Sequence, residues 1–168
     1  LNADTVAFTN SANDFAGTVV LNSTGNVSIH EQQVIALQGS ASSLDVRAGT
    51  EINQSGAINV SGATHLAAST INLTHAANNF AGDVSVNAIQ QANVSAGGDL
   101  SVGGNAGALN VSAQNELNLT ESVLESLNVT AQQVGQSGVV SVAGPSSIKA
   151  QNVSLLNGEN DFNGVVSL

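Results

Sequence analysis

A phrase of nine residues occurs three times in this chain and constrains its fold more than any other feature. Each copy has two Asn or Asp residues, one Phe, a Gly two residues later, and then mainly apolar residues. The copies are residues 13–21, 78–86 and 160–168. Asn, Asp and Gly mark a turn, and apolar alternation is typical of a β-strand. The chain is therefore predicted to be a repeat protein.

Longer stretches of sequence repeat around this phrase. The shift that carries Phe15 onto Phe80 also matches residue types throughout 6–46, and we call it the shorter shift. The longer shift carries Phe80 onto Phe162 and the Gln-Ser-Gly of 54–56 onto the Gln-Ser-Gly of 136–138. Two shifts of different length indicate two units that share a pattern but differ by an insertion.

The insertion and the unit boundaries follow from these shifts. The residues by which the longer shift exceeds the shorter one fall between Leu117 and Gln136. A stack of coils can accommodate such an insertion as about one extra coil. We therefore expect a single segment, 1–168, made of repeat units at about 6–70 and 71–152 and a partial unit at 153–168.

Short apolar segments set the fold class. Segments in which two apolar residues flank a third residue recur every few positions, for example at 27–29, 35–37 and 44–46. They are too short and too close together for helices between them, so strands joined by sharp turns are expected. Two or three strands make a coil of roughly 20 residues, and about eight coils make a rod roughly 40 Å long. The predicted fold is all-β, a parallel β-solenoid or β-helix.

A helix is the alternative prediction for two segments. Residues 30–37 and 121–127 contain good helix formers, and the second spaces its apolar residues as a helix does. The shorter shift sets a glycine-containing stretch, 96–102, against the first segment, and that stretch would form a poor helix. Strands remain the prediction for both.

The charge balance limits the partners. Twelve acidic residues against two basic ones give a net charge of −10. This charge opposes binding to nucleic acid or to an anionic membrane, and no apolar run is long enough to insert into a membrane as a helix. Neutral, polyhydroxylated or cationic partners are expected. The chain starts at Leu1 without a Met, and we expect it to be a piece of a longer protein.

Several phrases occur in a characteristic order. They are residues 12–19, 44–49, 52–56 and 71–74. In this order they resemble the repeats of large filamentous-haemagglutinin-like exoproteins of Gram-negative bacteria, and the resemblance covers essentially the whole chain. It implies a right-handed parallel β-helix shaft, export by an outer-membrane partner transporter (two-partner secretion), and an extracellular or cell-surface location. It also implies a role in adhesion, aggregation or biofilm matrix, in some members through exopolysaccharide binding.

An enzyme is the natural rival, because some β-helices cleave polysaccharides. Such catalysis needs clustered carboxylates, or bound Ca²⁺ with a nearby Arg or Lys. The only Arg and Lys, Arg47 and Lys149, stand far apart in the sequence. Asp45 would share a strand face with Arg47, which predicts a surface ion pair worth about 0 to 1 kcal/mol. We therefore predict no enzyme activity.

The histidines do not form a metal-binding pattern. His30, His65 and His75 show no HxH or HxxxH spacing, and Cys is absent, so they are expected to be turn or surface residues. No cofactor is predicted.

Calcium is the one metal alternative, at the paired Asn and Asp residues of the repeated phrase. One copy has two neutral Asn residues, which suits a hard cation poorly. The preferred interpretation is a turn in which Asn adopts a positive φ and hydrogen-bonds its own backbone.

The repeated aromatic and glycine positions have two interpretations. We expect the rings to fill the core beside their turns, with the glycines leaving room; an exposed platform for stacking sugars is the alternative. These repeat positions are Phe15, Gly17, Phe80, Gly82, Phe162 and Gly164. The neighbouring candidates for a ligand surface are Asp14, Asn79 and Asp161.

Asn-x-Ser/Thr triplets occur ten times. The strand pattern explains most of them, with Asn and Ser or Thr facing water on either side of an inward apolar residue. The resemblance leaves glycosylation as the alternative.

The sequence thus predicts the structural shaft of a secreted surface adhesin. A carbohydrate-binding surface on the segment itself is the first alternative, and a polysaccharide lyase or hydrolase is the second.

Overall fold

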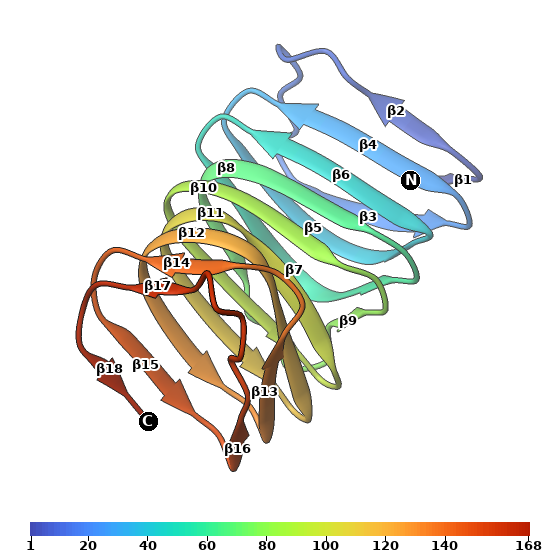
Figure 1. Ribbon diagram of the computed structural model, residues 1–168. Helices are drawn as coiled ribbons and strands as arrows, with labels where there is room; N and C mark the ends of the chain where they lie inside the picture. Colours follow the sequence, from blue (N-terminus) through green and yellow to red (C-terminus); the bar gives the residue numbers. More distant parts are fainter.

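Each coil of the chain pairs in parallel with its neighbours, and the computed structural model describes all residues, 1–168 (Figure 1). About nine coils of roughly 18 residues each form one stack, a parallel β-solenoid, with the two termini at opposite ends. The strands are β1 (Asn2–Ala3), β2 (Val6–Phe8), β3 (Thr18–Ser23), β4 (Asn26–Glu31), β5 (Val34–Ala41), β6 (Ser43–Ala48), β7 (Glu51–Val60), β8 (Thr64–Leu73), β9 (Asn79–Phe80), β10 (Val84–Ala96), β11 (Leu100–Ala113), β12 (Glu116–Thr130), β13 (Gln133–Gln136), β14 (Val140–Val142), β15 (Ser146–Lys149), β16 (Asn152–Val153), β17 (Asp161–Phe162) and β18 (Val166–Ser167).

Strand pairing gives the stack three faces. The first face runs through β2, β4, β6, the start of β8, the early part of β10 and the middle parts of β11 and β12, and then β14 and β17. The second face runs through β3, β5, the start of β7, the ends of β8, β10, β11 and β12, and then β15 and β18. The third face holds β1, the ends of β3, β5 and β7, then β9, the starts of β11 and β12, β13 and β16. Long strands such as β12 therefore bend around the corners between faces.

The core is a narrow column of aliphatic side chains. Buried and exposed residues alternate along the strands, because successive side chains of a strand point to opposite sides of the sheet. Forty buried apolar residues form one cluster, and Ile35, Ile52 and Ile71 illustrate the stacking, each directly above the last in paired strands. Burying an aliphatic side chain of this size stabilises the fold by about 1.5–3 kcal/mol.

Coil length agrees with the prediction. Asn72 pairs with Asn93, 21 residues further on, and Asn93 pairs with Asn110, 17 residues further on. Leu117 pairs with Leu100 before it and with Val134 after it, at intervals of one coil. The stretch in which the insertion is predicted therefore spans about one coil, as expected for it.

The helical alternative is wrong for both segments. Residues 30–37 lie in β4 and β5, and residues 121–127 lie within β12. Ile35 and Leu37 are fully buried while their neighbours are not, so the two-residue alternation decides the structure over local helix propensity. The structure contains no helix long and apolar enough to cross a membrane.

The sequence repeat does not contain a whole number of coils. Val6 lies on the first face; its equivalent at the shorter shift, Ile71, lies on the second. The next equivalent, Val153, which the longer shift matches with Ile71, lies on the third face. Equivalent residues of successive repeats therefore lie on successive faces, and the repeated phrase appears at a different corner each time.

Candidate functional site

The corner between the second and third faces is organised by one buried side chain, Asn78. The Asn78 Nδ2 donates hydrogen bonds to the backbone oxygens of Leu73 (3.2 Å) and Ser95 (3.1 Å). Its Oδ1 accepts from the backbone N–H of Ile58 (2.9 Å) and from Nε2 of Gln54 (2.8 Å). Nδ2 also donates to the Gln54 Oε1, at 3.0 Å. These partners lie on three successive coils, and we call this arrangement the Asn clamp.

The clamp recurs at the other copies of the phrase. Asn160 pairs with Gln136 in the same reciprocal way, at 2.8 and 2.9 Å, and accepts from the backbone N–H of Val140. Asn13 donates to the backbone oxygens of Phe8 and His30, both at 3.1 Å. The repeated Gln-Ser-Gly and the repeated Asn are visible in the sequence, but their pairing across coils is not.

The turn before each clamp Asn is present as predicted, but the predicted backbone conformation and side-chain hydrogen bond of the Asn are wrong. The backbone N–H groups of Asn13, Asn78 and Asn160 each bond the carbonyl oxygen three residues earlier, which closes a turn. No residue other than Gly39 and Gly104 has a positive φ. The Asn residues therefore close the turn in ordinary backbone conformation, and their side chains bond other coils.

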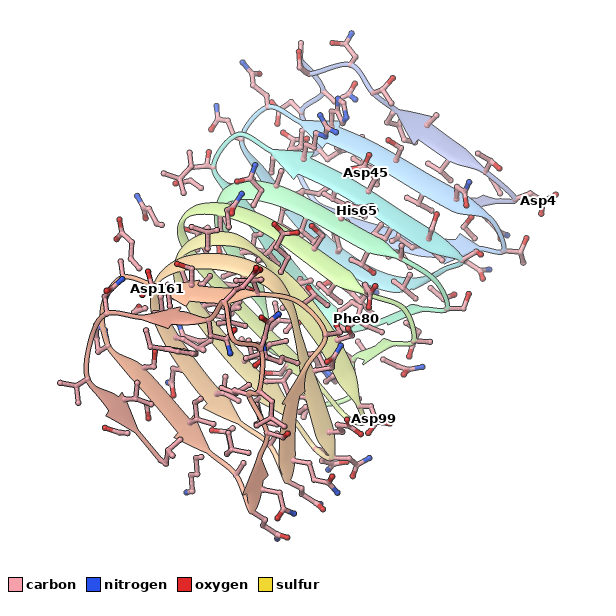
Figure 2. The ribbon with its side chains drawn as sticks, viewed as in Figure 1. Asp4, Asp45, His65, Phe80, Asp99 and Asp161 are labelled. Atoms are coloured by element: carbon pink, nitrogen blue, oxygen red, sulfur yellow. The ribbon has the colours of Figure 1, made fainter.

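The structure shows the place of the histidines. His75 opens the turn before Asn78, and its Nδ1 accepts a hydrogen bond from the backbone N–H of Ala77 (3.1 Å), just as Asn10 and Asn157 do in the other copies. His65 is exposed on the first face beside Asp45 (Figure 2). No group of three or more His, Cys, Asp or Glu side chains is placed to hold a metal ion.

The predicted surface ion pair is confirmed. Arg47 Nε lies 3.7 Å from Asp45 Oδ1, and both side chains are solvent-exposed, at 63% and 39%. Exposed pairs of this kind contribute about 0 to 1 kcal/mol. The pair leaves Arg47 on the open surface of a strand rather than in a carboxylate cluster.

The repeated Phe residues lie against the core. Phe80 is 3% exposed and faces the interior beside Val60. Phe15 and Phe162 pack against the same core but are only partly buried, in the outer coils. The Phe15 ring meets Phe8 edge-on, with ring centres 5.7 Å apart. Phe80 therefore presents no exposed ring face to a ligand.

The repeated glycines have a different role from the one expected. A Cβ on Gly82 would stand 2.5 Å from the carbonyl carbon of Gly62, one coil below, and a Cβ on Gly164 would collide with Gly144 in the same way. Nothing lies within 4 Å of the same position on Gly17. The glycines let two coils approach closely at a corner, and they do not make room for Phe.

Gly82→Ala is expected to destabilise the chain by about 1–3 kcal/mol or more, because the added methyl group meets fixed backbone. Gly17→Ala is the matched control: it changes the same repeat position where space is open, and it should leave stability within about 0.5 kcal/mol. Urea unfolding followed by circular dichroism measures both. Equal effects at the two positions would contradict the close-approach explanation.

The candidate ligand residues do not form one surface. Asp14, Asn79 and Asp161 are all exposed, but each lies beside a different corner of the stack. In Figure 2, Asp161 and Phe80, the neighbour of Asn79, are on opposite sides. The repeat therefore does not build a groove of acidic and aromatic side chains along one face.

The Asn-x-Ser/Thr triplets of the second face form a ladder instead. The Asn93 Nδ2 donates to the Asn72 Oδ1 (2.5 Å), and the Asn110 Nδ2 donates to the Asn93 Oδ1 (2.8 Å). Asn72 in turn donates to the Glu51 Oε1 at 2.8 Å. These amides are engaged along the stack, so their spacing reflects the coil period.

A known family of repeats matches this chain twice, with the same repeat period. A family model described as repeats of unknown function, DUF5649, matches the chain twice, at residues 24–87 and 106–168. The two matches cover well over half of the chain. The chain belongs to this family of repeats. The starts of the two DUF5649 copies, at positions 24 and 106, are offset by the longer shift found in the sequence. Each copy contains one Gln and Asn clamp pair and one stacked glycine pair. No curated protein and no solved structure matches the chain.

Proposed function

We propose that the chain is the shaft of a secreted bacterial surface adhesin. In this proposal it resembles filamentous-haemagglutinin-like exoproteins in role as well as in sequence. A partner transporter carries it across the outer membrane of a Gram-negative cell, and the rod holds an adhesive part away from the surface in attachment, aggregation or biofilm matrix.

The Asn clamp is the observation that supports this proposal most. The repeated polar side chains, Asn78 with Gln54 and Asn160 with Gln136, join successive coils instead of facing solvent. The stacked glycines serve the same contact between coils. A repeat whose characteristic residues join successive coils suits a rigid spacer better than a row of ligand sites.

The surface is consistent with an extracellular shaft that does not bind nucleic acid. The net charge of −10 repels phosphate backbones and keeps rods apart in solution. No three His, Asp or Glu side chains gather in one place, and Arg47 is paired on the open surface of a strand. The proposal therefore assigns no catalytic role.

Antibodies against residues 1–168 test the location, and deletion of the gene tests the role. We expect them to label intact cells of the source bacterium outside the outer membrane, and we expect loss of the gene to reduce attachment and cell aggregation. Label confined to broken cells, or unchanged attachment and aggregation in the gene-deleted strain, would contradict the proposal.

A further inference from the structure

The chain contains two Asn-Gly pairs, Asn157-Gly158 and Asn163-Gly164, and the fold holds them differently. An Asn that precedes Gly is prone to spontaneous loss of its side-chain amide, because the glycine has no side chain to shield its backbone nitrogen and its backbone turns easily toward the carboxamide. The sequence gives both pairs the same intrinsic reactivity. Any difference between them therefore comes from the fold.

The turn that precedes Asn160 favours the reaction at Asn157. Asn157 and Gly158 are both exposed. The Asn157 Oδ1 accepts a hydrogen bond from the backbone N–H of Glu159 at 3.0 Å, which holds the carboxamide carbon and the Gly158 nitrogen in one closed ring of atoms. The same N–H stabilises the negative charge that develops on Oδ1 during attack. A Cβ on Gly158 would have no neighbour within 4 Å, so nothing hinders rotation of the backbone there.

The exposure of this turn is a property of the repeat. The equivalent residues 74–77 are all exposed, although Asn78 beside them bonds the coils on both sides. The side chain that opens the turn is His75 in that copy and Asn10, followed by Ser11, in the first copy. Only the last copy combines the exposed turn with an Asn-Gly pair.

The second pair, Asn163-Gly164, is held by the stack. The Asn163 Nδ2 donates to the Asp161 Oδ2 at 2.9 Å, and the Asn163 backbone N–H bonds the carbonyl oxygen of Val142 at 3.0 Å. A Cβ on Gly164 would stand 2.1 Å from the carbonyl oxygen of Gly144, so the backbone here lies against another coil. Rotation of this backbone is hindered, and attack by the Gly164 nitrogen is hindered with it.

We propose that Asn157 is a site of spontaneous modification, and that its conversion loosens the clamp between Asn160 and Gln136. The Gly158 nitrogen forms a bond to the Asn157 Cγ, the Cγ–Nδ2 bond breaks, and ammonia leaves with the proton that the Gly158 nitrogen gives up. Water then opens the cyclic imide. Opening at Cγ gives aspartate, and opening at the backbone carbonyl carbon gives isoaspartate, in which the main chain runs through Cγ.

The modified turn no longer closes in the same way. The Asn160 N–H bonds the Asn157 carbonyl oxygen at 3.2 Å. In isoaspartate this carbonyl becomes a carboxylate outside the main chain, and the main chain is longer by one methylene group. Either product also adds a negative charge close to Glu159, in a chain whose net charge is already −10. The Asn160 side chain therefore loses the fixed position from which it bonds Gln136. This modification does not depend on the proposed shaft role.

Peptide mapping of the purified 168-residue chain after incubation at mildly alkaline pH tests the site. Trypsin cuts after Lys149 and a glutamate-specific protease cuts after Glu159, so the two pairs fall in separate peptides, 150–159 and 160–168. Mass spectrometry compares the amide and acid forms with an unincubated sample. We expect Asn157 to convert at least about tenfold faster than Asn163 in the folded chain, and at a similar rate in concentrated urea. Equal rates in the folded chain, or the same difference in urea, would overturn the proposal.

Gly158→Ala places a methyl group in open space, so the fold should persist. It should slow the conversion of Asn157 by about tenfold or more, because the methyl group shields the attacking nitrogen. Gly98→Ala is the matched control, since a Cβ there also has no neighbour within 4 Å, and it should leave the conversion unchanged. Unchanged conversion in Gly158→Ala, or equal slowing by both variants, would overturn the assignment.

Urea unfolding tests the link to the clamp. The incubated chain should unfold at a lower urea concentration than the fresh chain. Incubation should lower the midpoint less in the Asn160→Ala variant, because its clamp is already absent. Asn157→Asp, which carries the new charge on an unaltered main chain, should lose less stability than the incubated chain. An equal loss on incubation with and without the Asn160 side chain would contradict the link to the clamp.

Discussion

Asn78→Ala is expected to lower the free energy of unfolding by about 3–5 kcal/mol, because each buried polar group left unsatisfied costs about 1–3 kcal/mol. The substitution leaves the Gln54 side chain, the Ile58 N–H and the Leu73 carbonyl without their partner at a buried corner. Urea unfolding of the purified chain followed by circular dichroism measures the loss.

Asn79→Ala is the control for this prediction, because Asn79 is the next residue in the chain and is exposed. It should change stability by less than about 0.5 kcal/mol. The double variant Q54A/N78A should cost less than the sum of the two single variants, since each removes the same reciprocal pair. Similar losses for Asn78→Ala and Asn79→Ala would show that the clamp does not hold the coils together.

Phe80→Ala is expected to cost about 3–5 kcal/mol, because it removes a large buried side chain from a narrow core. Phe8→Ala changes the same residue type where the side chain is 39% exposed, and it should cost clearly less. Thermal and urea unfolding compare the two. If Phe80→Ala left the stability unchanged, the result would favour the alternative interpretation of the ring as an exposed platform for sugars.

The sequence was sufficient to predict the solenoid because its evidence is local and repeated. Alternation at 27–29, 35–37 and 44–46 defines short strands with one inward face, and the spacing of those strands fixes the coil length. The same alternation outweighed helix propensity at 30–37, where long polar residues had suggested a helix. A difference between two repeat lengths predicted an insertion between Leu117 and Gln136, and the structure has one coil from Leu117 to its partner Val134.

The clamp was not predictable in the same way. Gln54 and Asn78 are 24 residues apart, which is more than one coil, and their contact depends on how far the chain travels around the axis. Small variations of coil length, from 17 to 21 residues, decide which face each residue reaches. The repeated Gln-Ser-Gly at 54–56 and 136–138 was the available signal, because it recurs at the same shift as the repeated Asn.

The contacts of the repeated glycines and the placement of the candidate ligand residues were not predictable from the sequence either. Gly82 appeared to serve Phe80 because the two are close in sequence, whereas its actual neighbour is Gly62 on another coil. Asp14, Asn79 and Asp161 share a repeat position, but the rotation by one face separates them. Equivalence in sequence does not place residues on one surface when the repeat is not a whole number of coils.

Deletion of residues 55–136 tests most directly the claim that the rod is built from interchangeable units. The deletion joins Gln54 to Ser137 and removes one full period, which equals the offset of the two DUF5649 copies. It should leave a folded β-rich rod in which Gln54 clamps Asn160, shorter by about 20 Å in small-angle X-ray scattering. Deletion of residues 55–128, which is out of phase, is the control and should unfold the remaining chain. Unfolding of the in-phase variant, or equal folding of both, would contradict the account.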